Sequence, residues 1–279
     1  MKVLYITGAA GADYMADVVM HGLRSLLGPD LVDVNKMWFM YDTSPHYMFH
    51  SLYKLLPDIL VDREDIPAKI NSHYFDAIVY GSTHRCVDHL DHVRAAYPRN
   101  KIAFIDGEDD HGICGTLGQG WYFKREMPAP HPDMLPIQFG IPKEKIRPID
   151  LARKTMLMAP CDPRDRTTYQ YYDSESRYYD QYSDAYFGYT MKKGGWDCMR
   201  HVEIMAAGAL PYFADLESCP VETLALFPKE ELLRARIIHD TWPQHKDEYY
   251  IAILQNTVYT LQTQVTTEAI ARRVLDRLQ

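Results

Sequence analysis

The chain has 279 residues, of which 47% are hydrophobic and 24% charged, a composition typical of soluble globular proteins and a length sufficient for two domains. Its formal net charge of −8 argues against a general nucleic-acid binder, because such proteins present a basic face to the phosphates. No stretch approaches the roughly 18 consecutive apolar residues of a membrane-spanning helix, so we expect no membrane span.

The cysteines and the N-terminus predict a cytoplasmic protein. The 5 cysteines are odd in number and form no CxxC pair, which favours reduced thiols over a disulfide framework. The apolar run at residues 3–7 is short and rich in β-branched residues, so we interpret it as a buried first strand rather than as part of a signal peptide.

The first half of the sequence alternates strand and helix patterns. Predicted strands cover residues 2–7, 30–35, 76–82 and 101–106, and predicted helices cover residues 12–28 and 88–97. This alternation predicts βαβ units and a parallel sheet, in which function gathers at the loops after the carboxyl ends of the strands. The loops that qualify are residues 8–13, 81–85 and 106–111.

A proline-rich passage at residues 126–150 predicts a domain boundary, dividing the chain into domains 1–150 and 151–279. The second half contains further strand and helix patterns. Strands are predicted at residues 154–160, 186–191 and 210–214, and helices at residues 174–183, 197–207, 223–237, 245–262 and 267–278. The fold class is therefore α/β, with two domains.

The sequence GGWDCMRHVEIMAAGALPYFAD, residues 194–215, gathers charged residues at the start of a helix that leads into a buried strand. Gly194 and Gly195 would let a phosphate approach the helix N-terminus, and Arg200 adds a guanidinium suited to phosphate oxygens. Glu203, on nearly the same helical face, is placed to accept hydrogen bonds from ribose hydroxyls. Alternatively, Asp197 caps the helix, and Arg200 and Glu203 form a surface ion pair.

This stretch, followed by CPVETLALFP at residues 219–228, resembles the donor-binding region of GT-B glycosyltransferases. The resemblance is to the exostosin-like group and to small glycosyltransferases of large algal (chlorella) viruses, including xylosyltransferases of N-glycan synthesis. The upstream phrases YFKRE and LPIQFGIP are similar to that group as well. The matching positions are Arg200, Glu203, Gly208, Pro211 and Asp215.

The resemblance implies two Rossmann-like domains that face each other across a cleft, with the acceptor on the N-terminal domain and the nucleotide sugar on the C-terminal domain. It further implies a transfer of a single sugar, xylose from UDP-xylose, to a glycan hydroxyl, in the host cytoplasm for a viral protein. The C-terminal helices are expected to cross back to the first domain. Side chains such as Arg125 and Arg200 would neutralise the diphosphate, so we expect no divalent metal and no cofactor besides the donor.

An inverting transfer needs a general base at a strand-end loop of the N-terminal domain. Asp13 follows the first strand in a glycine-containing loop, and Asp109 belongs to the acidic loop at residues 106–111. We predict Asp13 first and Asp109 second, although Asp13 is equally suited to cap the first helix.

Two other functions remain open from the sequence. One is a non-catalytic nucleotide-binding or glycan-binding module on the same fold. The other is a metal-dependent hydrolase that uses His84, His89 and His92, although their spacing matches no regular zinc motif. The tyrosines at residues 169–189 are interpreted mainly as a packed wall, with at most one or two stacking on sugars.

Overall fold

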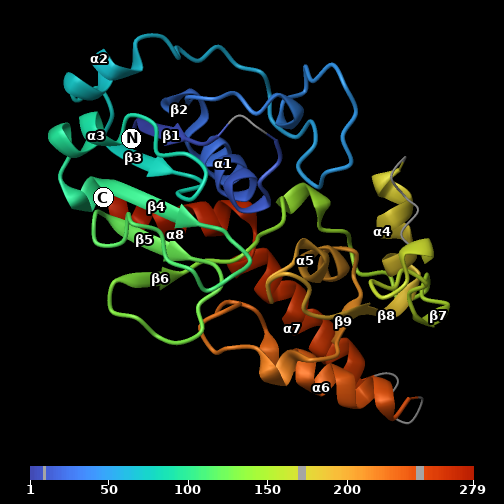
Figure 1. Cartoon of the computed structure of the whole chain (residues 1–279). Coiled ribbons are helices and arrows are strands. Elements are labelled where there is room, and N and C mark those ends of the chain that lie inside the picture. The colour runs from blue at the N-terminus through green and yellow to red at the C-terminus, as the bar shows by residue number, and fades with distance from the viewer. Residues whose placement is uncertain (9–10, 169–173, 243–247) are drawn as a thin grey trace.

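The computed structural model describes residues 1–8, 11–168, 174–242 and 248–279, which form two parallel sheets. The first sheet has the strand order β2-β1-β3-β4-β5-β6 and the second the order β7-β8-β9. Each sheet carries its own helices, and the two halves lie side by side (Figure 1). The strands are β1 (Val3–Ile6), β2 (Leu31–Asp33), β3 (Ala77–Tyr80), β4 (Ile102–Asp106), β5 (Trp121–Lys124), β6 (Met134–Pro136), β7 (Met156–Met158), β8 (Ala185–Thr190) and β9 (Leu210–Phe213).

The strands of the first sheet are mostly apolar because both faces of the sheet are covered, and their charged residues are Asp33, Asp106 and Lys124. In β1, Val3 and Tyr5 belong to one hydrophobic core, while Leu4 and Ile6 belong to another on the opposite face. The core on the side of Val3 continues without interruption into the second half of the molecule. The two halves therefore share one core instead of meeting only through polar surfaces.

The helices are α1 (Tyr14–Leu27), α2 (Ile66–Asn71), α3 (Leu90–Ala96), α4 (Glu175–Ser183), α5 (Met199–Ala206), α6 (Lys229–Asp240), α7 (Glu248–Gln264) and α8 (Thr267–Leu278). The described part of the chain contains no helix long and apolar enough to cross a membrane. The structure confirms the strands predicted in both halves, as well as the helices α1, α3, α4, α5 and α8.

Several predicted boundaries were wrong. The helix expected at residues 223–237 begins only at Lys229, because Pro228 precedes it and residues 223–226 form a turn. The strands β5 and β6 and the helix α2 were not predicted. The helix expected at residues 245–262 starts within residues that lie outside the described part of the chain, and α7 is described from Glu248.

The last helix, α8, packs against α1 of the first half, although it follows the helices of the second half in the chain (Figure 1). Gly22 of α1 is the point of closest approach, since a Cβ atom there would lie 2.0 Å from the carbonyl oxygen of Thr267. At the other end of α8, the ammonium group of Lys101 donates hydrogen bonds to the backbone oxygens of Leu278 and Gln279 at 2.8 and 2.9 Å. The predicted boundary at residue 150 falls between the two sheets, but α8 belongs by its packing to the first.

Candidate functional site

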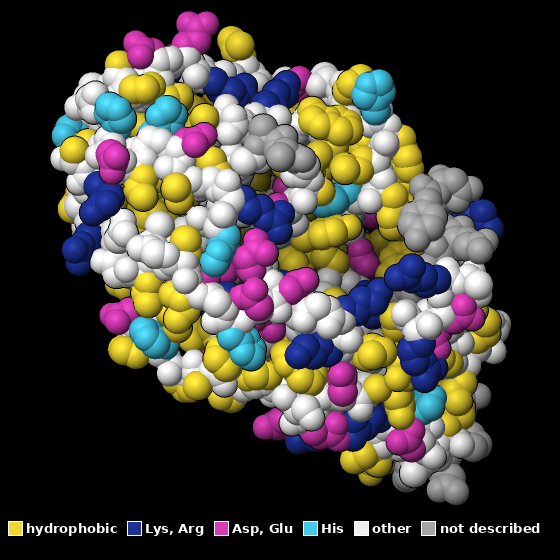
Figure 2. All heavy atoms as spheres, viewed as in Figure 1, with side chains coloured by type: hydrophobic (Ala, Val, Ile, Leu, Met, Phe, Trp, Pro, Cys, Tyr) yellow, Lys and Arg dark blue, Asp and Glu magenta, His cyan; other side chains and the backbone are white. Residues whose placement is uncertain are grey.

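A cavity of about 460 Å³ is lined by residues from both halves of the molecule. Figure 2 shows the surface hollowed between the halves, with hydrophobic side chains inside and charged side chains around the rim. The first half contributes the start of α1, one residue of the segment between β2 and α2, the loop after β4, and one residue of the segment after β6. The second half contributes α4 and the start of α5. The lining residues are Tyr14, Phe49, Asp109, Phe139, Tyr178, Lys193, Gly194, Gly195, Asp197, Cys198, Met199, Arg200 and Glu203.

Glu203 lies in the wall of this cavity, on the second turn of α5. Its carboxylate accepts a hydrogen bond from the hydroxyl of Ser51 on Oε1 and one from the hydroxyl of Tyr178 on Oε2, the latter at 2.9 Å. Burial raises the pKa of Glu203, and these two hydrogen bonds act in the opposite direction. A carboxylate with two oxygens held and further lone pairs available can accept hydrogen bonds from a polyhydroxylated ligand.

The start of α5 directs positive charge toward the same cavity. Cys198 is the N-cap residue and provides no side-chain hydrogen bond, so the first backbone N–H groups of the helix receive no cap from it. Arg200, on the first turn, is buried and donates a hydrogen bond to the hydroxyl of Thr190 at 3.3 Å. A helix N-terminus beside a guanidinium group is an arrangement that binds anions.

The structure contradicts the alternative in which this helix is a capped surface element. Asp197 precedes the N-cap and is buried, and Arg200 and Glu203 are buried as well. One oxygen of Asp197 accepts a hydrogen bond from the backbone N–H of Phe139 at 2.6 Å, and burial raises the pKa of this carboxyl to about 7. The sequence did not single out Asp197 as a site residue.

Arg125, predicted to bind the diphosphate, is 1% exposed and is not part of the cavity wall. Its guanidinium group donates to the backbone oxygens of Gly107 and Asp197 at 2.9 and 2.6 Å, and it pairs with the carboxylates of Glu126 and Asp109. These contacts connect the loop after β4 to the segment before α5. Arg125 is therefore buried outside the cavity wall, and its hydrogen bonds join the two halves of the molecule.

Gly194 and Gly195 do line the cavity, and acidic side chains of the first half also lie close to both. A Cβ atom on Gly194 would lie 2.3 Å from Oδ2 of Asp109, and one on Gly195 would lie 2.4 Å from Oε1 of Glu126. The sequence attributed both glycines to the approach of a phosphate. Packing against the buried side chain of Glu126 is a second and sufficient reason for Gly195.

The two predicted bases lie at different places. Asp109 lines the large cavity, and its carboxylate is paired with Arg125. Asp13 lines a separate pocket of about 150 Å³ at the ends of β1 and β3. It caps α1 by accepting a hydrogen bond from the backbone N–H of Ala16 at 3.3 Å, it accepts another from the hydroxyl of Ser82 at 2.8 Å, and it lies 3.2 Å from the guanidinium group of Arg85. The capping role that the sequence left open for Asp13 is thus present.

The histidines proposed for a metal site do not come together. His84 contacts the buried carboxylate of Asp106 at 2.9 Å, whereas His89 precedes α3 with a φ of 61°. Within residues 1–8, 11–168, 174–242 and 248–279, no group of three or more His, Cys, Asp or Glu side chains is arranged to hold a metal ion. The hydrolase alternative therefore lacks the ligand cluster on which it depended.

Most of the described tyrosines in the aromatic stretch are packed, as predicted. Tyr178, Tyr179 and Tyr182 of α4 are buried, and Tyr178 reaches Glu203 through its hydroxyl. Tyr169, Tyr171 and Tyr172 lie outside the described residues. Ser51 and Tyr178, which hold Glu203, were not identified from the sequence, and neither were Tyr14 and Phe49 of the cavity wall.

Comparison with proteins of known structure identifies the fold of the chain. No protein-family model and no curated protein sequence matches the chain. Two solved structures of HepE from Anabaena, one in complex with UDP-glucose and one with UDP and glucose, match at TM-scores of 0.54 and 0.52. Each alignment covers 100% of this chain and 99% of the other at 9% sequence identity. The likeness shows that the chain has the GT-B fold along its whole length, with two Rossmann-like halves facing each other across a cleft, as predicted.

Proposed function

We propose that the protein is a UDP-sugar-dependent glycosyltransferase whose donor binds in the cavity of about 460 Å³ between the two halves. The observation that carries this proposal is the joint placement of a buried carboxylate, Glu203, and a buried guanidinium, Arg200, on one helix whose N-terminus opens into that cavity. The solved GT-B neighbours are complexes with UDP-glucose and with UDP and glucose, which supports the same ligand class for this chain.

Each part of the donor has a complementary group. The diphosphate would lie at the start of α5, near Arg200 and Lys193, where positive charge stabilises the charge that develops on the leaving group. The ribose would lie at Glu203, whose carboxylate accepts hydrogen bonds from its hydroxyls. Because these groups supply the positive charge themselves, we propose that the transfer needs no divalent ion.

The acceptor glycan would approach from the first half, where Asp109 and Asp13 are the candidate bases. Asp109 lies in the wall of the donor cavity, whereas Asp13 lies in the smaller pocket nearby. We propose an inverting transfer in which one of these carboxylates takes the proton of the attacking hydroxyl. The specific donor that we propose, UDP-xylose, and an N-glycan acceptor rest on the sequence resemblance alone.

Ligand-induced thermal stabilisation tests the donor site directly. The melting temperature of the protein would be measured with UDP, GDP, ADP and CMP, each with and without a chelator. A ligand present at about 100 times its Kd adds roughly 2.7 kcal/mol of stability, and we expect a shift of about 5 °C with UDP. We expect this shift to persist with chelator and to shrink strongly in Glu203→Gln.

Glu217→Gln is the matched control, because Glu217 pairs with Arg236 on the surface of the second half and is not part of the cavity wall. This variant should retain the full UDP shift. If no nucleotide stabilises the native chain, the donor-site proposal fails. A shift that is equal in Glu203→Gln and in the native chain would remove Glu203 from the site.

Turnover separates an enzyme from a non-catalytic binding module on the same fold. Release of UDP from UDP-xylose and UDP-glucose would be followed with glycan acceptors for the native chain, Asp109→Asn and Asp13→Asn. We expect the variant of the true base to lose at least about a hundredfold in rate while keeping its thermal shift with UDP. Binding of UDP-sugars by the native chain without any turnover would support the module instead.

A further inference from the structure

Residues 49–51 form a short segment of the first half that contacts Glu203 of the second half. Ser51 is buried, and its hydroxyl donates the hydrogen bond to Oε1 of Glu203, a residue 152 positions further along the chain. Phe49 lines the cavity, and its ring meets that of Tyr178 edge-on at a centroid distance of 6.1 Å. One end of this segment therefore contacts Glu203 itself, and the other contacts Tyr178 beside it.

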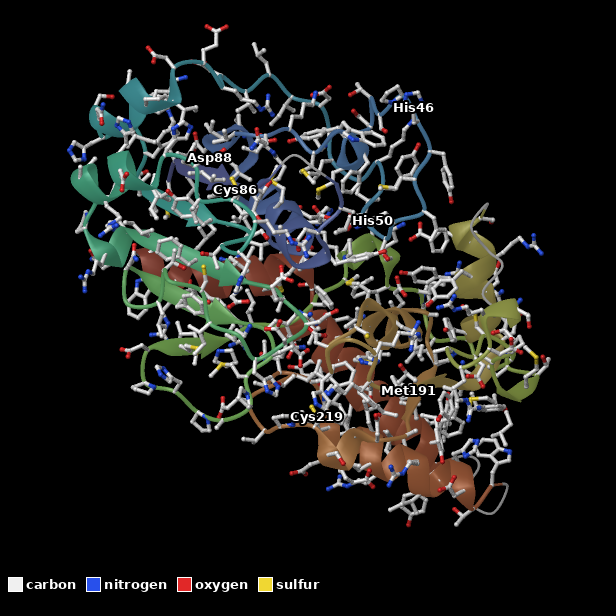
Figure 3. All side chains as sticks on the ribbon, viewed as in Figure 1. His46, His50, Cys86, Asp88, Met191 and Cys219 are labelled. Atoms are coloured by element: carbon white, nitrogen blue, oxygen red, sulfur yellow. The ribbon has the colours of Figure 1, made fainter. Side chains whose placement is uncertain are left out.

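His50 fixes the segment on the first turns of α1. Its ring stacks on Tyr14 with the centroids 4.3 Å apart, and Nε2 lies 3.2 Å from Oδ2 of the buried Asp17. The backbone N–H of Leu52 donates to Nδ1 at 3.1 Å, so Nδ1 is an acceptor. Figure 3 shows His50 on the side of the first half that faces the second. The position of Ser51 is thus set by the first half and not by Glu203.

The hydrogen bonds to Glu203 come from opposite sides of the cleft. Ser51 belongs to the first half and Tyr178 to α4 of the second, and each holds a different carboxylate oxygen. An ionised carboxylate offers about four acceptor positions, so two remain after these contacts. Because both oxygens are held, the plane of the carboxylate is fixed, and so are the directions in which the remaining positions point.

We propose that Ser51 is a positioning residue for the donor ribose. By holding the carboxylate of Glu203, it directs the remaining acceptor positions toward the ribose hydroxyls, and the first half thereby helps to set the affinity of the second half for ribonucleotides. This inference rests on the proposed function and adds to it a residue that the N-terminal half contributes to the donor site. The site is complete only when the two halves are together.

The proposal is tested by comparing how UDP, 2′-deoxy-UDP and 3′-deoxy-UDP bind to the native chain and to Ser51→Ala, using calorimetric titration. The native chain should prefer UDP to at least one deoxy analogue. A hydrogen bond to a charged group contributes on the order of a tenfold change in binding when it orients that group, so we expect Ser51→Ala to bind UDP about tenfold more weakly. It should also lose much of the preference for UDP over the deoxy analogue.

Three further variants separate positioning from a general loss of structure. Ser51→Thr keeps a hydroxyl and should restore much of the native affinity and preference. Tyr178→Phe removes the hydrogen bond on the other oxygen and should reduce the preference in the same way. Ser44→Ala is the matched control, because the buried hydroxyl of Ser44 donates to the backbone oxygen of His46 at 3.0 Å in the same part of the chain. It should bind all three nucleotides as the native chain does.

The pH dependence of binding gives an independent measurement. The hydrogen bond from Ser51 lowers the pKa of Glu203, so its removal should raise that pKa further above the usual range. If the ionised carboxylate holds the ribose, affinity is lost as the pH falls through the pKa of Glu203. Glu175 and Arg200 also act on the pKa of Glu203, but Ser51→Ala leaves both in place, so the loss should begin at a higher pH in this variant than in the native chain. Asp197 in the same cavity titrates as well, so Glu203→Gln should lack only the part of the pH dependence that Glu203 contributes.

The outcomes distinguish this inference from the function on which it rests. If the native chain binds UDP and Ser51→Ala binds the three nucleotides with native affinities and native preference, the role of Ser51 is refuted while the donor site stands. If the native chain binds no nucleotide, the proposed function itself fails. If Ser51→Ala does not fold, the preference for UDP over the deoxy analogue is measured in Tyr178→Phe and Ser51→Thr instead. A native preference in Tyr178→Phe would contradict a carboxylate that is positioned by its two hydrogen bonds.

Discussion

Gly194 and Gly195 are adjacent in the chain, but the structure gives them different neighbours. A Cβ atom on either would come within 2.4 Å of a carboxylate oxygen. The side chain of Asp109, which faces Gly194, is 65% exposed and can swing away, whereas that of Glu126, which faces Gly195, is 1% exposed. Glu126 is held there by Arg125 and by the backbone N–H of Asp197.

We therefore predict that Gly195→Ala destabilises the protein by about 2–3 kcal/mol, because an overpacked and hydrogen-bonded site cannot relax. Gly194→Ala should cost less than about 1 kcal/mol, since a partly exposed side chain can move. Chemical denaturation of the two variants measures both free energies of unfolding. Equal losses in the two variants would show that burial of the neighbouring carboxylate does not decide the effect.

Asp197 should make stability depend on pH. Its pKa of about 7 in the folded protein, raised by burial, is well above the value of about 3.9 for an unfolded chain, so the folded state holds a proton that the unfolded state has released between these values. The free energy of unfolding contributed by this group therefore falls as the pH rises from about 4 to 7.

Asp197→Asn removes that proton uptake. We predict that the stability of this variant relative to the native chain rises between about pH 4 and pH 7, by roughly 4 kcal/mol at most. Urea denaturation of both proteins across this range measures the difference. A difference that stays constant with pH would contradict a raised pKa for Asp197.

At the scale of elements, the contact between α1 and α8 depends on Gly22. A Cβ atom there would lie 2.0 Å from the carbonyl oxygen of Thr267 and 2.7 Å from Cβ of Ala271, and a backbone atom cannot move aside as a flexible side chain can. We predict that Gly22→Ala costs about 3 kcal/mol or more, measured by thermal or urea denaturation. Gly115→Ala is the control, because no atom lies within 4 Å of its added Cβ and the residue is exposed. A native stability for Gly22→Ala would mean that the helices can separate freely.

Apolar runs in the sequence predicted most of the helices and strands. The strands that were not predicted have features that explain why the sequence pattern did not reveal them. The strand β5 carries Lys124, which is buried because its ammonium group pairs with Asp106 at 2.9 Å, a partner that local sequence does not reveal. The strand β6 is three residues long, ends in Pro136 and lies at the edge of the sheet, where proline is tolerated. Short elements stabilised by tertiary partners leave little periodicity to detect.

The candidate site was predictable to the extent that its residues are close in the chain. Gly194, Gly195, Arg200 and Glu203 belong to one stretch and do line one cavity, joined there by Asp109. The contribution of Ser51 and the buried position of Arg125 depend on how the halves pack, and no spacing in the sequence encodes that packing. The metal interpretation of the histidines failed because shared helical spacing does not ensure a shared centre.

At the scale of the whole molecule, the cavity exists because the halves are held together at several independent points. Arg125 joins the loop after β4 to the segment before α5, Ser51 meets Glu203, and one hydrophobic core runs through both halves. Relative motion of the halves would disturb all three. The donor cavity is thus a property of the assembled chain and not of either sheet alone.

The return of α8 to the first half also has a consequence for biosynthesis. The face of α1 that contains Gly22 is covered by residues 267–278, which are synthesised after the strands of both sheets. A nascent chain that has exposed the whole first sheet still lacks the helix that covers this face. The N-terminal half, although made first, can finish folding only after the second half and α8 have been synthesised, and until then its uncovered apolar surface is available to chaperones.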